Sequence, residues 1–210
     1  MKKDFKREFS ACYLQKKGQI SIVEVPEFQY LMIDGQGDPN DSQTFQEAVE
    51  SLFGMSYKIK FANKANPNTP DYTVMPLEGL WWAEDMSDFA ALDRSEWLWT
   101  MMILQPDFID AALVEQVKMD LAKAKKLPAL AKVRFEAMSD GLSAQTLHLG
   151  PFAEEQPTIQ QLHQFIHDNG FQLSGKHREI YLSDMRRSAP EKLKTIIRQP
   201  MARKGGGNKA

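Results

Sequence analysis

Glu179 is the residue of this chain whose position most strongly suggests chemistry. It stands in the middle of the run from His177 to Leu182, which has the alternating pattern of a half-buried strand. A carboxylate in such a place costs free energy unless it is paired or has a task, such as contact with a polar or cationic ligand. The structural alternative is a salt bridge to Lys176, His177 or Arg178, although adjacent strand residues point to opposite faces and pair poorly.

The tryptophans are the second feature, because all of them fall between residues 81 and 99. They are Trp81, Trp82, Trp97 and Trp99. On a strand, Trp97 and Trp99 share one face and Trp81 and Trp82 point oppositely, so at most three can line one cavity. Each could simply be a core residue, but their concentration favours a flat apolar groove for planar ligands. Weaker candidates for the walls of this groove are Tyr57, Met101, Phe135 and Tyr181.

Two tyrosines add proton chemistry to this set. The hydroxyl of Tyr57 or Tyr181 could donate a hydrogen bond or a proton, and Glu179 could orient or deprotonate a water molecule. Glu179, Tyr57 and Tyr181 are therefore the candidate catalytic residues. The spacing of the three in the sequence does not show whether they meet.

Other kinds of site have little support. His163 and His167 are four residues apart on an expected helix, but no neighbouring Glu or Cys completes a metal set, so a solvated pair is favoured. No phosphate-binding glycine motif is present, and we expect neither a cofactor nor a metal. Cys12 is the single cysteine, which excludes an internal disulfide framework and is typical of the cytoplasm.

The composition limits the classes of molecule that this chain is expected to bind. The 210 residues carry a formal net charge of −2, which gives no electrostatic reason to expect nucleic acid or an anionic membrane as partner. No run has the length and apolarity of a membrane span or of a signal peptide. We expect a cytoplasmic protein whose partner is a small hydrophobic or cationic ligand. The oligomeric state is left open.

The strands and helices expected to carry these residues occur twice in the chain, in the same order. Residues 97–106 align without a gap on residues 191–200, and both segments end in Gln-Pro. Residues 28–35 and 143–150 are expected strands that end at glycine, and each precedes an amphipathic helix expected to stop at Gly54 or Gly170. The order predicts an α+β fold of tandem β-α-β-β modules with pseudo-two-fold symmetry, in which helices cover one face of antiparallel sheets. A cleft between the modules is the expected ligand site.

The expected boundaries follow from this repeat. A polar lead-in precedes a single domain over residues 21–201, and a disordered glycine-rich tail follows. Within the domain, residues 72–82 are expected to be extended, residues 108–126 form the longest helix, and residues 131–138 and 143–149 form a hairpin about Asp140-Gly141. The segments are the lead-in 1–20, module one 21–106, the linking helix 107–127, module two 130–201 and the tail 202–210.

Four stretches of the sequence resemble one known family. They are His148-Leu-Gly-Pro-Phe152, the strand from His177 to Asp184, Ala189-Pro-Glu-Lys-Leu193, and Pro76-Leu-Glu-Gly-Leu-Trp-Trp82. Together they resemble the GyrI-like small-molecule-binding domain, and the double tryptophan is similar to the signature of its stand-alone subgroup. The resemblance covers residues 22–200. It implies two strand-helix-strand-strand (SHS2) modules about a groove, and it places Glu179 at the acidic base of a multidrug-binding pocket.

Three functions are consistent with these observations. The leading hypothesis is a binding protein for small apolar, planar or cationic molecules, acting in xenobiotic sensing or protection. It would have no DNA-binding domain, because residues 1–20 are too few for a helix-turn-helix. The resemblance also implies a hydrolase that opens strained cyclopropane rings of DNA-alkylating natural products. The third alternative is a gyrase-inhibitor-like protein.

Overall fold

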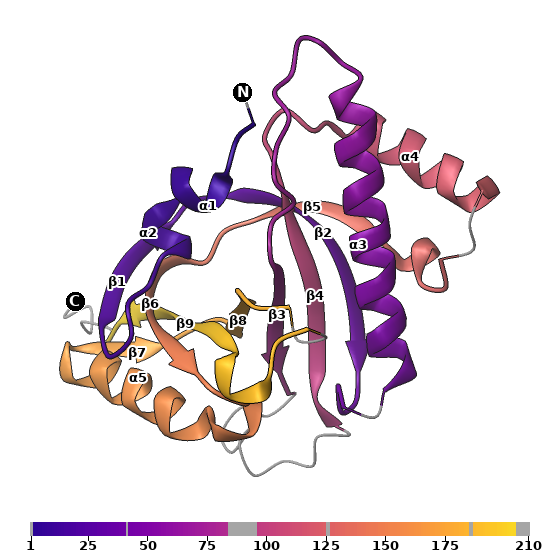
Figure 1. The fold of residues 1–210 in the computed structure, drawn as a ribbon. Helices are drawn as coiled ribbons and strands as arrows, with labels where there is room; N and C mark the ends of the chain where they lie inside the picture. The colour runs from indigo at the N-terminus through magenta and orange to yellow at the C-terminus, as the bar shows by residue number, and fades with distance from the viewer. Residues whose placement is uncertain (1, 41, 84–95, 125–126, 185–186, 205–210) are drawn as a thin grey trace, which may run out of the picture. The chain divides into compact units, whose positions relative to one another are not determined.

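A computed structural model describes residues 2–40, 42–83, 96–124, 127–184 and 187–204 of the chain (Figure 1). The chain forms two compact units. Unit 1 comprises residues 1–10 and 27–138, and unit 2 comprises residues 11–26 and 139–210. Neighbouring strands within each unit are antiparallel, and each sheet packs against a long helix.

Unit 1 is a four-stranded sheet in the order β3-β4-β2-β5. Helix α3 packs against β2 and β4, and α4 packs against α3. The strands and helices of this unit are α1 (Phe5–Glu8), β2 (Phe28–Gln36), α3 (Gln43–Lys64), β3 (Leu77–Trp82), β4 (Leu98–Gln105), α4 (Ala111–Ala124) and β5 (Arg134–Met138).

Unit 2 is a sheet in the order β1-β6-β9-β8, and β7 pairs with the end of β9. Helix α5 packs against β6 and β9 of this unit. Its strands and helices are β1 (Ile20–Val25), β6 (Gly141–Leu149), α5 (Gln156–Asp168), β7 (Phe171–Leu173), β8 (His177–Tyr181) and β9 (Lys194–Arg203); the short helix α2 (Ser10–Tyr13) lies where the chain passes from one unit to the other.

The predicted repeat is present in both units. The order β2-α3-β3-β4 in unit 1 matches β6-α5-β8-β9 in unit 2, apart from the short strand β7. In each module the last strand lies between the first strand and the middle one. The predicted α+β class, with tandem β-α-β-β modules and a helix on one face of each antiparallel sheet, is confirmed.

Each unit also takes an edge strand from the segment that precedes the other unit's module. Strand β1 comes just before β2 in the chain but pairs with β6, and β5 comes just before β6 but pairs with β2. The hairpin expected about Asp140-Gly141 is therefore wrong, because its two strands belong to different units. Likewise, the strand at the start of the segment 21–106 lies in unit 2.

The helix lengths also differ from the prediction. Helix α3, with 22 residues, is longer than α4, with 14, and it continues through Gly54. Its N-cap Ser42 accepts a hydrogen bond from the backbone N–H of Phe45, and a continuous buried stripe runs from Phe45 to Asn63. A methyl group on Gly54 would lie 3.0 Å from Leu127, so this glycine allows close packing and does not end the helix.

The two ends of the chain are more ordered than expected. The lead-in 1–20 contains α1 and α2, whose side chains Phe5, Cys12 and Tyr13 are buried. Strand β9 continues to Arg203, into the segment expected to be disordered, because its end pairs with β7. Residues 205–210 of that expected tail lie outside the described residues. The expected strand at residues 72–82 begins only at Leu77.

Candidate functional site

Glu179 lies on the face of the unit 2 sheet that α5 covers. In the register of β8 and β9 it is directly opposite Ile197. Ile197 belongs to a buried apolar cluster with Leu162 and Ile166 of α5. Residues paired across an antiparallel sheet point to the same face, so the Glu179 side chain lies between the sheet and the helix.

The carboxylate of Glu179 lies close to two residues of its own strand, one of which donates a hydrogen bond to it. The Tyr181 hydroxyl donates a hydrogen bond of 2.8 Å to Oε2, and the ring Nε2 of His177 lies 3.3 Å from Oε1. Both residues are two positions away and share the same face. The side chain of Glu179 is 14% exposed. The structure thus brings Glu179 together with one of its two candidate tyrosines, and of the expected salt-bridge partners His177 is in contact with it.

Arg178 points to the other face of the sheet, where it takes part in a buried ion cluster. Its Nη2 lies 3.0 Å from Oδ1 of Asp140, and Nη1 of Arg198 lies 3.3 Å from Oδ2. Arg198 also donates to the Cys12 carbonyl at 2.6 Å and to the Gln145 side chain at 3.0 Å. Asp140 is therefore the centre of an ion cluster that ties several segments of unit 2 together.

A second carboxylate, Glu155, faces Glu179 from the start of α5. It is 4% exposed, and its Oε1 has no hydrogen-bond partner among the described residues. Burial, followed by the negative charge of Glu179, raises the pKa of Glu155 to about 10; the Thr195 hydroxyl beside it opposes part of this shift. Glu155 is therefore a neutral carboxylic acid at pH 7, next to a carboxylate that accepts hydrogen bonds.

His163 completes the polar lining under α5. Burial, the positive charge of His177 and that of His167 lower the pKa of His163 to about 4, so the ring is neutral at pH 7. The prediction of a solvated histidine pair is correct for the exposed His167 but not for the half-buried His163. No group of three or more metal-ligating side chains occurs among the residues that the structure describes.

Trp81, Trp97 and Trp99 belong to an aromatic cluster in unit 1. Phe45 of α3 packs against Trp81 with ring centroids 6.1 Å apart and against Trp99 at 5.4 Å, and Trp97 lies 5.8 Å from Trp81. Trp81 and Trp99 are directly opposite each other on β3 and β4. Both are buried beneath α3, so packing of the core accounts for them.

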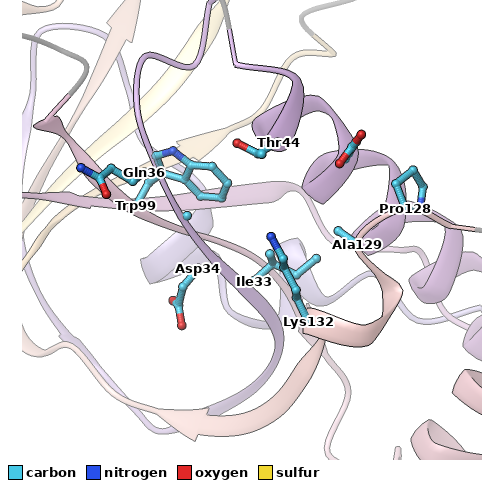
Figure 2. A pocket seen from close by; sticks show the side chains of 10 residues that line it. Ile33, Asp34, Gln36, Thr44, Trp99, Pro128, Ala129 and Lys132 are labelled. Atoms are coloured by element: carbon cyan, nitrogen blue, oxygen red, sulfur yellow. The ribbon is translucent and has the colours of Figure 1, made fainter.

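Trp99 also lines a cavity of about 250 Å³ in unit 1 (Figure 2). The indole ring lies across Gly35, where an added Cβ would come within 2.2 Å of it. The remaining lining combines apolar and charged residues from β2, α3 and the segment before β5: Ile33, Asp34, Gln36, Thr44, Glu47, Pro128, Ala129 and Lys132.

The remaining predicted residues of unit 1 do not line this cavity. Tyr57 is on α3, 48% exposed, and its ring stacks on Phe53. Met101 is buried on β4, Phe135 is half-buried on β5 opposite Leu31, and Trp82 is half-buried at the end of β3. Of all the predicted site residues, only Glu179 and Tyr181 belong to unit 2.

Comparison with known proteins identifies the family. The sequence model described as GyrI-like small molecule binding domain matches residues 18–201. The chain belongs to the GyrI-like family. Binding of a small molecule is therefore the activity that the family supports. Separately, none of the described helices is long and apolar enough to cross a membrane.

Solved structures from Listeria innocua are similar over nearly the whole chain. An uncharacterized conserved protein is 39% identical and has a TM-score of 0.86; the alignment covers 95% of this chain and 99% of that protein. A protein described as a hydrolase is 38% identical, again with a TM-score of 0.86, over 96% of this chain and 100% of its own. A further structure described as a hydrolase is 36% identical, with a TM-score of 0.83 and coverage of 95% and 99%.

A more distant structure shares the fold alone. The C-terminal domain of EcmrR is 14% identical, with a TM-score of 0.56 over 88% of this chain and 98% of that domain. No curated protein matches the chain.

Proposed function

We propose that this GyrI-like protein binds small apolar, planar or cationic molecules at the acidic centre of unit 2, in a protective role against foreign compounds. The observation that carries this proposal is the carboxylate of Glu179, close to Tyr181 and His177 beneath α5 and next to the buried Glu155. A carboxylate in a partly desolvated place attracts a cation more strongly than the same group would in water.

Charge and burial both favour a cation over an anion. The described partners of the two carboxylates are Tyr181, His177 and Thr195, and the neighbouring Arg178 points away to Asp140. Phe152, whose ring lies 5.6 Å from that of Tyr181, adds an aromatic surface beside the carboxylate. An aromatic face together with a carboxylate suits a flat, positively charged molecule.

Titration with the cationic dye rhodamine 6G, followed by the fluorescence anisotropy of the dye, tests this function. We expect saturable binding that weakens at least tenfold in Glu179→Gln, because loss of one close charge pair costs about 1.4 kcal/mol or more. Glu191→Gln is the matched control, since Glu191 is exposed and lies outside the site. Equal affinity in the wild type and Glu179→Gln would contradict a binding role for this carboxylate.

Hydrolysis of the bound molecule is the second candidate function. Two Listeria proteins with 36% and 38% identity are described as hydrolases, and the site pairs an acceptor carboxylate with a neutral acid. In such a reaction Glu179 would take a proton from a water molecule while the oxygen of that water forms a bond to a strained ring carbon. The ring bond would break toward a conjugated carbonyl, and Glu155 would supply the proton that this oxygen accepts.

The geometry changes the role expected for the tyrosines. The Tyr181 proton is already donated to Glu179, so in this proposal Glu155 takes the role of the acid. Mass analysis of a cyclopropane-bearing indole alkylator incubated with the protein tests turnover. We expect a product heavier by one water that is lost in Glu179→Gln and in Glu155→Gln but kept in Glu154→Gln, because Glu154 is exposed. Substrate that stays unchanged beyond the background rate would contradict hydrolysis and leave binding alone.

A further inference from the structure

The two carboxylates under α5 pose a problem of charge balance. Glu155 is almost completely buried, and the group that faces it from β8 is Glu179. A pair of carboxylates at close range in a desolvated place cannot both be ionised at low cost, so one proton keeps the pair at a single negative charge.

The described groups that contact the pair do not provide a fixed positive charge. Thr195 faces Glu155 from β9, while Tyr181 and His177 contact the Glu179 carboxylate on β8. On α5 itself, His163 is neutral at pH 7, because its pKa is lowered to about 4.

On β6, the side chain of His148 is hydrogen-bonded to Thr158 and to the carbonyl of Pro151. A proton is thus the charge that balances the second carboxylate in the ligand-free protein.

We propose that the site exchanges this proton for its ligand: when a cation binds at the contacting pair of Glu155 and Glu179, Glu155 releases its proton to the solvent. The bound cation then supplies the positive charge that the proton supplied before. The balance is one cation taken up and one proton released, with no other bond formed or broken. This inference rests on the proposed cation-binding function and adds to it a dependence on pH.

The direction of the dependence follows from the state of Glu155. Burial and the negative charge of Glu179 raise the pKa of Glu155 far above its usual range, so protons compete with the cation at and above neutral pH. For each unit by which the pH rises, the dissociation constant of a permanent cation should therefore fall by up to about tenfold. An uncharged dye such as Nile red should show no such slope, because it cannot replace the proton.

Calorimetric titration of the full-length protein with rhodamine 6G, in two buffers of different ionisation enthalpy at pH 8, measures the protons released. We expect about one proton per dye in the wild type and in Glu154→Gln. In Glu155→Gln, whose neutral amide cannot lose a proton, we expect none, together with an affinity that no longer changes between pH 7 and 9.

The outcomes separate the inference from the function on which it rests. Dye binding without proton release in the wild type would overturn the exchange while leaving the binding function in place. Release that persists in Glu155→Gln would also overturn it, because the proton would then come from another group such as His177. Absence of any dye binding would overturn the cation-binding function, and the exchange with it.

Discussion

The two modules share their backbone pairing and differ in what that pairing presents to the covering helix. In unit 1, Met101 of β4 is directly opposite Ile33 on one side and Gly79 on the other. The equivalent row of unit 2 places Thr195 of β9 opposite His148 and Tyr181. One fold thus carries an apolar row under α3 and a polar row under α5.

The candidate carboxylate fits the same comparison. Glu179 is opposite Ile197, and the residue opposite the equivalent Ile103 in unit 1 is Leu77. At this position unit 1 has the apolar side chain of Leu77, which packs in the core, and unit 2 has the carboxylate of Glu179. The lesson is that the repeat supplies a scaffold in both units, while a few substitutions on the helix-covered face of one unit supply the polar site.

The largest expected effect comes from placing the polar residue in the wrong unit. Leu77→Glu would put a carboxylate on the buried face of the unit 1 sheet, directly opposite Ile103. We expect the free energy of unfolding to fall by about 3 to 5 kcal/mol, as for an uncompensated buried charge. Urea denaturation measures this. A loss below about 1 kcal/mol would mean that both units tolerate a carboxylate here.

Truncating the core should have a slightly smaller effect, equal in the two units. Leu52 of α3 and Ile166 of α5 are both fully buried against their own sheets. Leu52→Ala and Ile166→Ala should each cost about 3 kcal/mol of unfolding free energy. Denaturation curves in urea would show this, with Leu14→Ala as an exposed control. A cost for Ile166→Ala that matches the control would show that α5 does not hold unit 2 together.

The smallest expected effect is a pH dependence found in unit 2. The pKa of His163 is about 4 in the folded protein against about 6.5 in the unfolded chain, so the unfolded chain binds the proton first. Stability should therefore fall as the pH decreases from about 6.5 to about 4, by about 1 to 2 kcal/mol for this half-buried ring.

Thermal unfolding of the wild type and His163→Gln across this range measures the effect, with Gln161→Ala, an exposed position on the same helix, as control. The variant should lose less stability than the wild type as the pH falls. Identical pH profiles for the wild type and His163→Gln would contradict a buried neutral histidine in unit 2.

Much of the fold could be predicted from the sequence because the signals were local. The strand ending at Gln105-Pro106 aligns with the one containing Gln199-Pro200, and the helical spacing on α3 and α5 is clear. The errors arose where local signals compete with tertiary packing. Glycine is common where a helix ends, but Gly54 lies within α3 because Leu127 packs closely against it. Asp140-Gly141 has the composition of a hairpin turn, but Asp140 is the centre of an ion cluster.

The site could be predicted only in part. The alternation around Glu179 identified a polar residue on a half-buried strand, whereas its contact with Tyr181 emerged only from the structure. Glu155 could not be found in this way, because an acidic residue near Pro157 at a helix start is ordinary. Its importance comes from Glu179, which is far along the chain and reaches it only through the packing of α5 on the sheet.

A crystal structure with rhodamine 6G bound tests the central claim most directly, because it compares the two regions in one measurement. Unit 2 offers the carboxylates under α5, and unit 1 offers the cavity lined by Trp99. We expect the cationic centre of the dye within about 6 Å of the Glu179 carboxylate, the range over which opposite charges stabilise each other. Dye seated in the Trp99 cavity, with Glu179 and Glu155 still in contact with each other, would contradict the assignment of the binding site to unit 2.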